Sequence, residues 1–143
     1  MGAGIAVAVN GSDSVAAVQD GAKLAAKTAN KSIKGIAISA EQNLKDTVSA
    51  KAGAAGGTAA VPVAAVDVNG GRANAYMGKV ASGSLTLDGD MALSAKNKAT
   101  HSITADASAV GGGTGIGAAI AVSVLGDEAV AKLNQSVKAE QVG

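Results

Sequence analysis

Three stretches of this chain repeat one another and decide its fold: IAVAVNG at residues 5–11, AAVDVNG at residues 64–70 and IAVSVLG at residues 120–126. Each places valine at alternate positions and ends in glycine. A further pair, IAISA at 36–40 and MALSA at 91–95, recurs at nearly the same interval. The chain therefore holds two full copies and a partial third of a repeat of about 56 residues.

Every repeated block alternates with period two, which is typical of β-strands and not of helices. A set of strands that recurs at a long, fixed period stacks each strand on its own copy, in parallel. We therefore expect an all-β fold, a parallel β-solenoid with about two to three coils per repeat. A single segment would hold repeat 1 at about 1–59, repeat 2 at about 60–115 and a partial repeat 3 at about 116–143.

The composition limits how such a core is filled. Hydrophobic residues make up 48% of the chain, yet it has no Trp or Phe and a single Tyr, Tyr76. A core of alanine and valine is filled only where backbone layers approach closely, as stacked strands about 4.8 Å apart allow. We expect the shared valines to point inward, so that Val122→Asp would bring an unpaired charge into the interior and destabilise the fold.

Glycine, asparagine and aspartate cluster between the blocks, at residues 10–13, 69–71 and 87–90, and these clusters predict turns. The segment at residues 20–34 is rich in alanine and lysine, which allows a helical turn. Its counterpart in the second copy, residues 78–89, contains Leu-Thr-Leu and several glycines, which disfavour a helix. Since equivalent positions share a fold, we expect strands in both segments.

Charge and hydropathy exclude several classes of function. The net charge is +1 with no basic stripe, so we expect no nucleic acid partner. The longest apolar run, residues 115–125, is shorter than a membrane helix requires and predicts a buried strand, so we expect no membrane insertion. No signal peptide is visible, because Met1 leads directly into repeat sequence, and we expect the chain to be part of a longer one.

Candidate chemical sites are sparse. His101 is the only histidine and cysteine is absent, so we expect His101 to be a solvated loop residue, opposite Asp46 of the first copy, and not a zinc ligand. The glycines of residues 113–117 lead into a strand and no GK[ST] follows, which favours close backbone packing over a phosphate loop. Asn10 and Asn69 occupy matching positions and predict a structural side-chain ladder.

Carboxylates follow the expected turns and lack the spacing of calcium-binding nonapeptides or the aromatic platforms of a glycosidase. They are Asp13, Asp20, Asp88, Asp90, Asp127 and Glu128. We therefore expect no catalytic residue, no cofactor-binding residue and no metal ligand, no cofactor, and a protein that is not an enzyme.

The segments AVAVN, ANAYM, LSA and AVGGGTGIGAAIAVSVL (residues 109–125) resemble the repeats of filamentous haemagglutinin-like and leukotoxin-like surface proteins of Gram-negative bacteria. The resemblance covers nearly the whole chain and is one of repeat texture. It implies a right-handed β-helical passenger exported by a two-partner or autotransporter route, located outside the cell or on its surface. The first copy departs from the pattern, since Ala17 stands where the second copy has Tyr76.

Together these observations predict a structural or adhesive rod, a stalk or passenger, whose possible partners are a host-cell surface protein or glycan. Open sheet edges at solenoid ends favour an alternative, a self-assembling fibre subunit that stacks on copies of itself. Outward threonines such as Thr86 and Thr104 form no regular array, which argues against an ice-binding surface.

Overall fold

The computed structural model describes residues 1–25 and 32–143. These residues form strands and turns without a helix, so none of them supplies a helix able to cross a membrane. The strands are β1 (Gly4–Val18), β2 (Ile36–Met77), β3 (Leu85–Thr86), β4 (Met91–Leu125), β5 (Glu128–Leu133) and β6 (Val137–Lys138). The prediction of an all-β fold is confirmed.

The strands pair one repeat apart. In the main sheet the order is β1-β2-β4, with β5 also beside β2. β2 and β5 run parallel with Arg72 opposite Glu128, the same offset that separates position 64 from position 120 in the repeated stretches. Backbone hydrogen bonds join the first copy to the second near both ends of β1, from Gly2 N–H to Ala60 O and from Gly78 N–H to Val18 O. β3 and β6 also run parallel, with Leu85 opposite Val137. Strands of successive copies therefore pair in parallel, as predicted.

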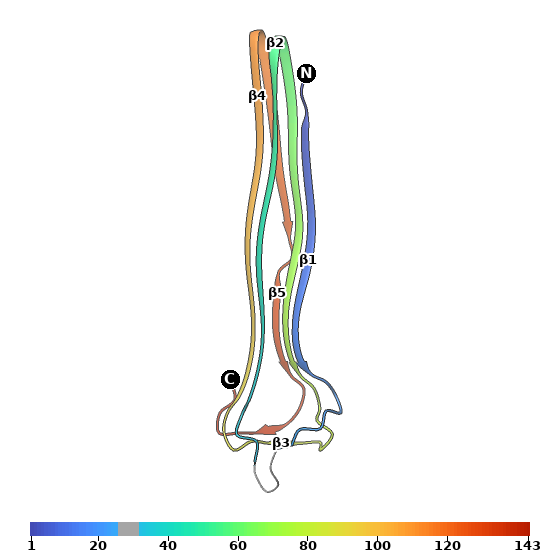
Figure 1. The fold of residues 1–143 in the computed structure, drawn as a ribbon, viewed down its shortest axis with the longest axis vertical. Coiled ribbons are helices and arrows are strands. Elements are labelled where there is room, and N and C mark those ends of the chain that lie inside the picture. Colours follow the sequence, from blue (N-terminus) through green and yellow to red (C-terminus); the bar gives the residue numbers. More distant parts are fainter. Residues whose placement is uncertain (26–31) are drawn as a thin grey trace. The chain divides into compact units, whose positions relative to one another are not determined.

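The strands are longer than the sequence blocks suggested. β2 and β4 each run to a glycine-rich segment and come back (Figure 1), and at the reversal of β2 Gly56 has a φ of +151°. Two of the predicted turns, residues 10–13 and 69–71, lie inside β1 and β2, whereas residues 87–90 do leave the strands. Because the chain meets its neighbouring copy once per repeat, the prediction of two to three coils per repeat is wrong.

The segment at residues 20–34 forms no continuous strand. A turn at Asp20 and Gly21 precedes irregular backbone to residue 25, and Ile33 makes a single bridge to Leu87. The remainder of the predicted strand or helical turn, residues 26–31, lies outside the described residues. In the counterpart, residues 78–89, only Leu85 and Thr86 form a strand, because glycines and serines interrupt the rest.

The structure comprises two compact units, and all three sequence copies contribute to each. Unit 1 contains residues 1–11, 44–70 and 99–127. Unit 2 contains residues 12–43, 71–98 and 128–143.

Small side chains fill unit 1. Its buried core consists of Val48, Ala50, Val61, Val63 and Ala65, with half-buried alanines packed against it. Backbone layers come so close that a Cβ added to Gly4 would lie 2.9 Å from Lys51 O. A Cβ on Gly117 would lie 2.9 Å from Ala107 O. The expected close packing of the glycines at 113–117 is thus confirmed, since even the methyl group of an alanine would press on the facing backbone at such positions.

Unit 2 buries larger side chains. Its two largest fully buried side chains are Met77 and Met91, at the end of β2 and the start of β4. Ala73, Ala75, Leu85 and Leu87 pack with them. Methionine is flexible enough to fill the irregular space where the long strands give way to turns.

The shared valines point outward, contrary to our expectation. In the repeated stretches the positions that directly precede each valine face the interior, so Ala65 is fully buried while Val68 and Val122 are 37% and 43% exposed. A strand that alternates alanine with valine has two apolar faces, and period two alone does not select the inner one. The narrow space between the layers selects the smaller residues. Val122 therefore does not point into the interior, and the prediction that Val122→Asp would place a charge there is wrong.

Two matched substitutions test this orientation. Val61 is 1% exposed, and Val61→Asp should destabilise the protein by more than about 3 kcal/mol, because a carboxylate would be buried without a partner. Val122→Asp, on the open surface, should change the free energy of unfolding by about 0.5 kcal/mol or less. Urea unfolding followed by circular dichroism measures both, and equal losses would contradict the assignment.

Candidate functional site

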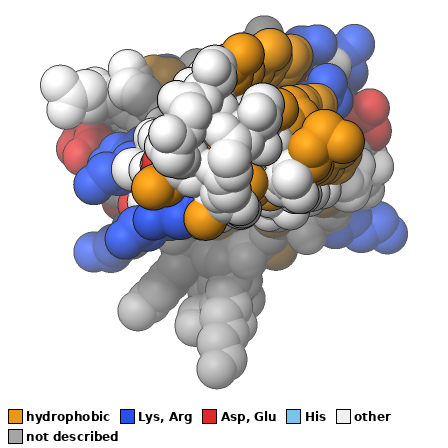
Figure 2. Space-filling view, turned by 90° about the horizontal axis from the view of Figure 1, so that it is seen from above, with side chains coloured by type: hydrophobic (Ala, Val, Ile, Leu, Met, Phe, Trp, Pro, Cys, Tyr) orange, Lys and Arg blue, Asp and Glu red, His pale blue; other side chains and the backbone are white. Residues whose placement is uncertain are grey.

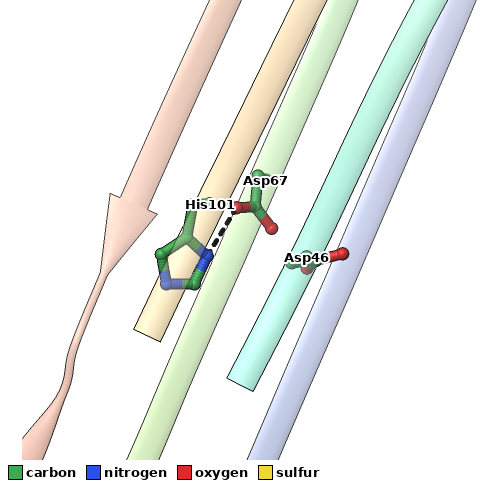
Figure 3. A group of neighbouring side chains, drawn as sticks. All are labelled: Asp46, Asp67 and His101. Carbon is green, nitrogen blue, oxygen red and sulfur yellow. Dashed lines mark ion pairs between the residues drawn. The ribbon is translucent and has the colours of Figure 1, made fainter. Parts of the chain in front are cut away.

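A polar cluster interrupts the apolar interior of unit 1. It consists of Asp46 and Asp67 on β2 and His101 on β4 (Figure 3). Inward positions in residues 44–54 carry even numbers and those in residues 59–69 carry odd numbers, so strand alternation turns both aspartates toward the interior. One nitrogen or oxygen atom from each of the three side chains lies within 4.8 Å of the others.

His101 lies between two carboxylates. Its Nδ1 is 3.4 Å from Asp67 Oδ2, and its Nε2 is 3.7 Å from Asp127 Oδ2. The His101 side chain is only 9% exposed and the Asp67 side chain 1%. The imidazole can therefore face a carboxylate with either nitrogen while shielded from water.

Asp46 is well supplied with hydrogen-bond donors. Asn10 Nδ2 and Asn69 Nδ2 both donate to Asp46 Oδ2, at 2.6 Å and 2.9 Å. The backbone N–H of Thr47 donates to Oδ1 at 2.8 Å. The hydrogen bond from Asn10 is the main cause that lowers the pKa of Asp46 below its usual 3.8, because donors favour the ionised form.

Asp67 is in the opposite situation. Neither of its carboxylate oxygens accepts a hydrogen bond, although both are buried. Burial raises the pKa of Asp67 above its usual 3.8, and the charge of Asp46 raises it further. Two further buried polar atoms nearby, Asn69 Oδ1 and His101 Nε2, also have no hydrogen-bond partner. A buried carboxylate in this state favours whatever neutralises it, a proton or a cation.

The structure corrects our view of His101. It does not lie in a solvated loop; it belongs to β4 with its side chain among three aspartates. The prediction that His101 lies opposite Asp46 is confirmed. It followed from the matching positions of the two residues in successive repeats. Asp67 was missed because the valines beside it were assigned to the interior, which placed the aspartate outside.

Asn10 and Asn69 do not form the predicted ladder with each other. Both donate to the same Asp46 oxygen, so their shared repeat position brings them together through a third residue. Among the turn carboxylates, Asp127 reaches the cluster through His101. Asp13, Asp20, Asp88, Asp90 and Glu128 belong to no group of three potential metal ligands in residues 1–25 and 32–143.

Unit 1 also presents an outer valine face, formed by the outward positions of the three repeated stretches. Its most exposed members are Ile5, Val7, Val9, Val68, Ile120, Val122 and Val124. Rows of hydrophobic side chains are visible at the surface in Figure 2. An apolar pocket on this face is lined by Ile5, Pro62, Ala64 and Ile120, among others. Continuous apolar surface of this kind is unusual on a soluble protein and typical of contact surfaces.

Comparison with known proteins gives no match, whether to a protein-family model, to a curated protein or to a solved structure.

Asp67→Asn tests the state of the buried carboxylate. The folded pKa is raised, so between 3.8 and that value the folded protein binds more protons than the unfolded chain. The contribution of Asp67 to stability is therefore lost as the pH rises through the folded pKa. In EDTA, Asp67→Asn should raise the melting temperature at pH 7, and the gain should shrink toward pH 4.

The matched control is Asp106→Asn, which removes an exposed carboxylate from the same strand as His101. It should leave the melting temperature unchanged across this range. A gain for Asp67→Asn that does not depend on pH would contradict the interpretation.

Proposed function

We propose that this chain is a segment of a right-handed parallel β-solenoid that serves as a stalk or passenger of a bacterial surface or secreted protein. One observation carries the proposal, namely that strands pair at the spacing of the sequence repeat. Arg72 lies opposite Glu128, its equivalent in the next copy, and the parallel pairing continues to Met77 and Leu133. A chain that meets its own copy once per repeat adds length with each repeat, which is what a stalk requires.

Residues 119–125 support the same proposal. Val63, Ala65 and Asn69 are buried in the second copy, whereas their equivalents in the third copy, Ala119, Ala121 and Leu125, are exposed. Leu125 is 50% exposed although it stands at an inward position. These positions suit a further layer of strand packed against them, equivalent to the one that covers the second copy.

The extracellular location and the adhesive role rest on the likeness of the repeats to haemagglutinin-like passengers. A core without disulfides is consistent with a large exported protein, since the chain has no cysteine. The outer valine face is a surface suited to a host protein or to another copy of the chain.

A self-assembling fibre subunit is the second candidate. β1 and β4 end the strand order of the main sheet, so each has one edge open to a further strand. Open edges and uncovered inward positions favour stacking of one chain on the next. In a fibre, the next layer of strands comes from a second molecule. In a stalk, it comes from the same chain.

Negative-stain electron microscopy over a range of protein concentrations tests both candidates. The stalk predicts discrete short rods at every concentration, whereas the fibre subunit predicts filaments that lengthen as the concentration rises. Compact round particles would contradict both, because neither function is compatible with a closed globular shape.

A double substitution, Ala121→Lys with Ser123→Lys, sharpens the test. Both residues occupy uncovered inward positions of β4, so two lysines there should abolish any filaments by blocking the next layer. The matched control, Ser102→Lys with Thr104→Lys, adds the same charge at outward positions of the same strand and should leave filaments unchanged. Filaments that survive the first pair would exclude stacking through β4.

A further inference from the structure

The polar cluster in unit 1 contains the donor set of a transition-metal site. It offers two carboxylates and one imidazole, from three separate strand segments, with one donor atom of each within 4.8 Å of the others. In zinc sites metal–ligand distances are about 2.0–2.2 Å, which places tetrahedral ligands about 3.3 Å apart. The three side chains therefore need only a small inward movement to share an ion.

Asp67 supplies an independent reason to expect a ligand. Its side chain is 1% exposed, neither of its oxygens accepts a hydrogen bond, and its ion-pair partner is the single imidazole of His101, whose Nδ1 lies 3.4 Å from Oδ2. An ionised carboxylate in such a position is costly unless it is paired or coordinates a metal. Buried carboxylates that serve only the fold are normally satisfied by hydrogen bonds, as Asp46 is.

Asp46 retains capacity for an ion. A carboxylate has about four acceptor positions, two on each oxygen. Asn10 and Asn69 occupy those of Oδ2, and the Thr47 N–H occupies one on Oδ1. One position on Oδ1 is left, and the three donors hold the carboxylate in place as outer-shell partners hold a metal ligand.

Asp127 completes the arrangement. A metal-bound histidine usually directs its second ring nitrogen to a carboxylate, which fixes the tautomer. With Nδ1 of His101 toward Asp67 and Nε2 toward Asp127 Oδ2, at 3.4 Å and 3.7 Å, the ring is oriented in this way. A single protonated imidazole brings one positive charge to Asp46, Asp67 and Asp127, whereas a divalent cation brings two.

We propose that Asp46, Asp67 and His101 bind a divalent transition-metal ion, with Zn²⁺ as the ion that fits best and Asp127 as the residue that positions His101. An imidazole ligand and a small number of protein donors favour Zn²⁺ over Ca²⁺ or Mg²⁺, which require several oxygen ligands. A water molecule is suited to the fourth position, since Asn69 turns its amide nitrogen toward Asp46 and His101. The proposal is independent of the role of the chain as a stalk.

The test uses the tag-free chain, stripped with EDTA and dialysed, and titrated with ZnCl₂ in a calorimeter. We expect one Zn²⁺ per chain and a higher melting temperature with Zn²⁺ than without it. Asp67→Asn and Asp46→Asn should each weaken binding at least tenfold (about 1.4 kcal/mol). Asp106→Asn, an exposed carboxylate on β4, should bind as the parent does.

A second measurement does not depend on variants that fold. Since His101 is the only histidine, its ¹⁵N ring resonances are unambiguous. Zn²⁺ should shift the Nδ1 resonance as a direct ligand and leave Nε2 protonated. The proposal is overturned if Zn²⁺ does not bind at millimolar concentration, if Asp67→Asn binds equally well, or if the His101 resonances do not respond.

Discussion

Parallel pairing of each strand with its own copy is the constraint on which the remaining structure depends. Backbone hydrogen bonds between positions one repeat apart fix which side chains meet, as with Arg72 and Glu128 or Gly78 and Val18. A strand shifted by one residue would exchange its inner and outer faces along its whole length. The copies can therefore differ in length only where the backbone leaves the sheet, as it does around residues 87–90.

The second constraint is the narrow space between strand layers. At Gly4 and Gly117 an added Cβ would lie only 2.9 Å from a carbonyl oxygen on the facing strand, so the interior of unit 1 admits alanine, glycine and a few valines. Branched side chains in excess of that space occupy the outer face. The same narrowness makes the polar cluster costly, because little room remains for water to solvate Asp67.

Much of the fold follows from sequence. The repeat, the strands and their parallel pairing were predicted from the spacing of blocks such as residues 5–11 and 64–70, since the period is a property of the chain itself. The inner face was not, because Ala65 and Val66 are both apolar and only the layer separation distinguishes them. The turn predicted at residues 10–13 is also absent. The Asn10 side chain donates a hydrogen bond to Asp46, and strand β1 continues through these residues.

The candidate site was half visible in the sequence. The matching positions of Asp46 and His101 placed them on neighbouring strands, but a lone histidine without cysteine gave no reason to look for a metal. Asp67 entered only when the inner face was known. Asp67 corresponds to Ala8 in the first copy and to Ser123 in the third. A charged residue at an inward position where the other copies have alanine or serine is the sequence pattern that indicates such a site.

Similar copies in one chain can mispair, since a strand of the first copy could align with the third. The cluster discriminates between these alignments. Asp46 finds two amide donors only if Asn10 and Asn69 flank it, and the third copy has Leu125 at that position. A chain that skipped a copy would leave the carboxylate against a leucine. Different residues at the same position of the repeat thus favour pairing of each strand with the correct neighbouring copy.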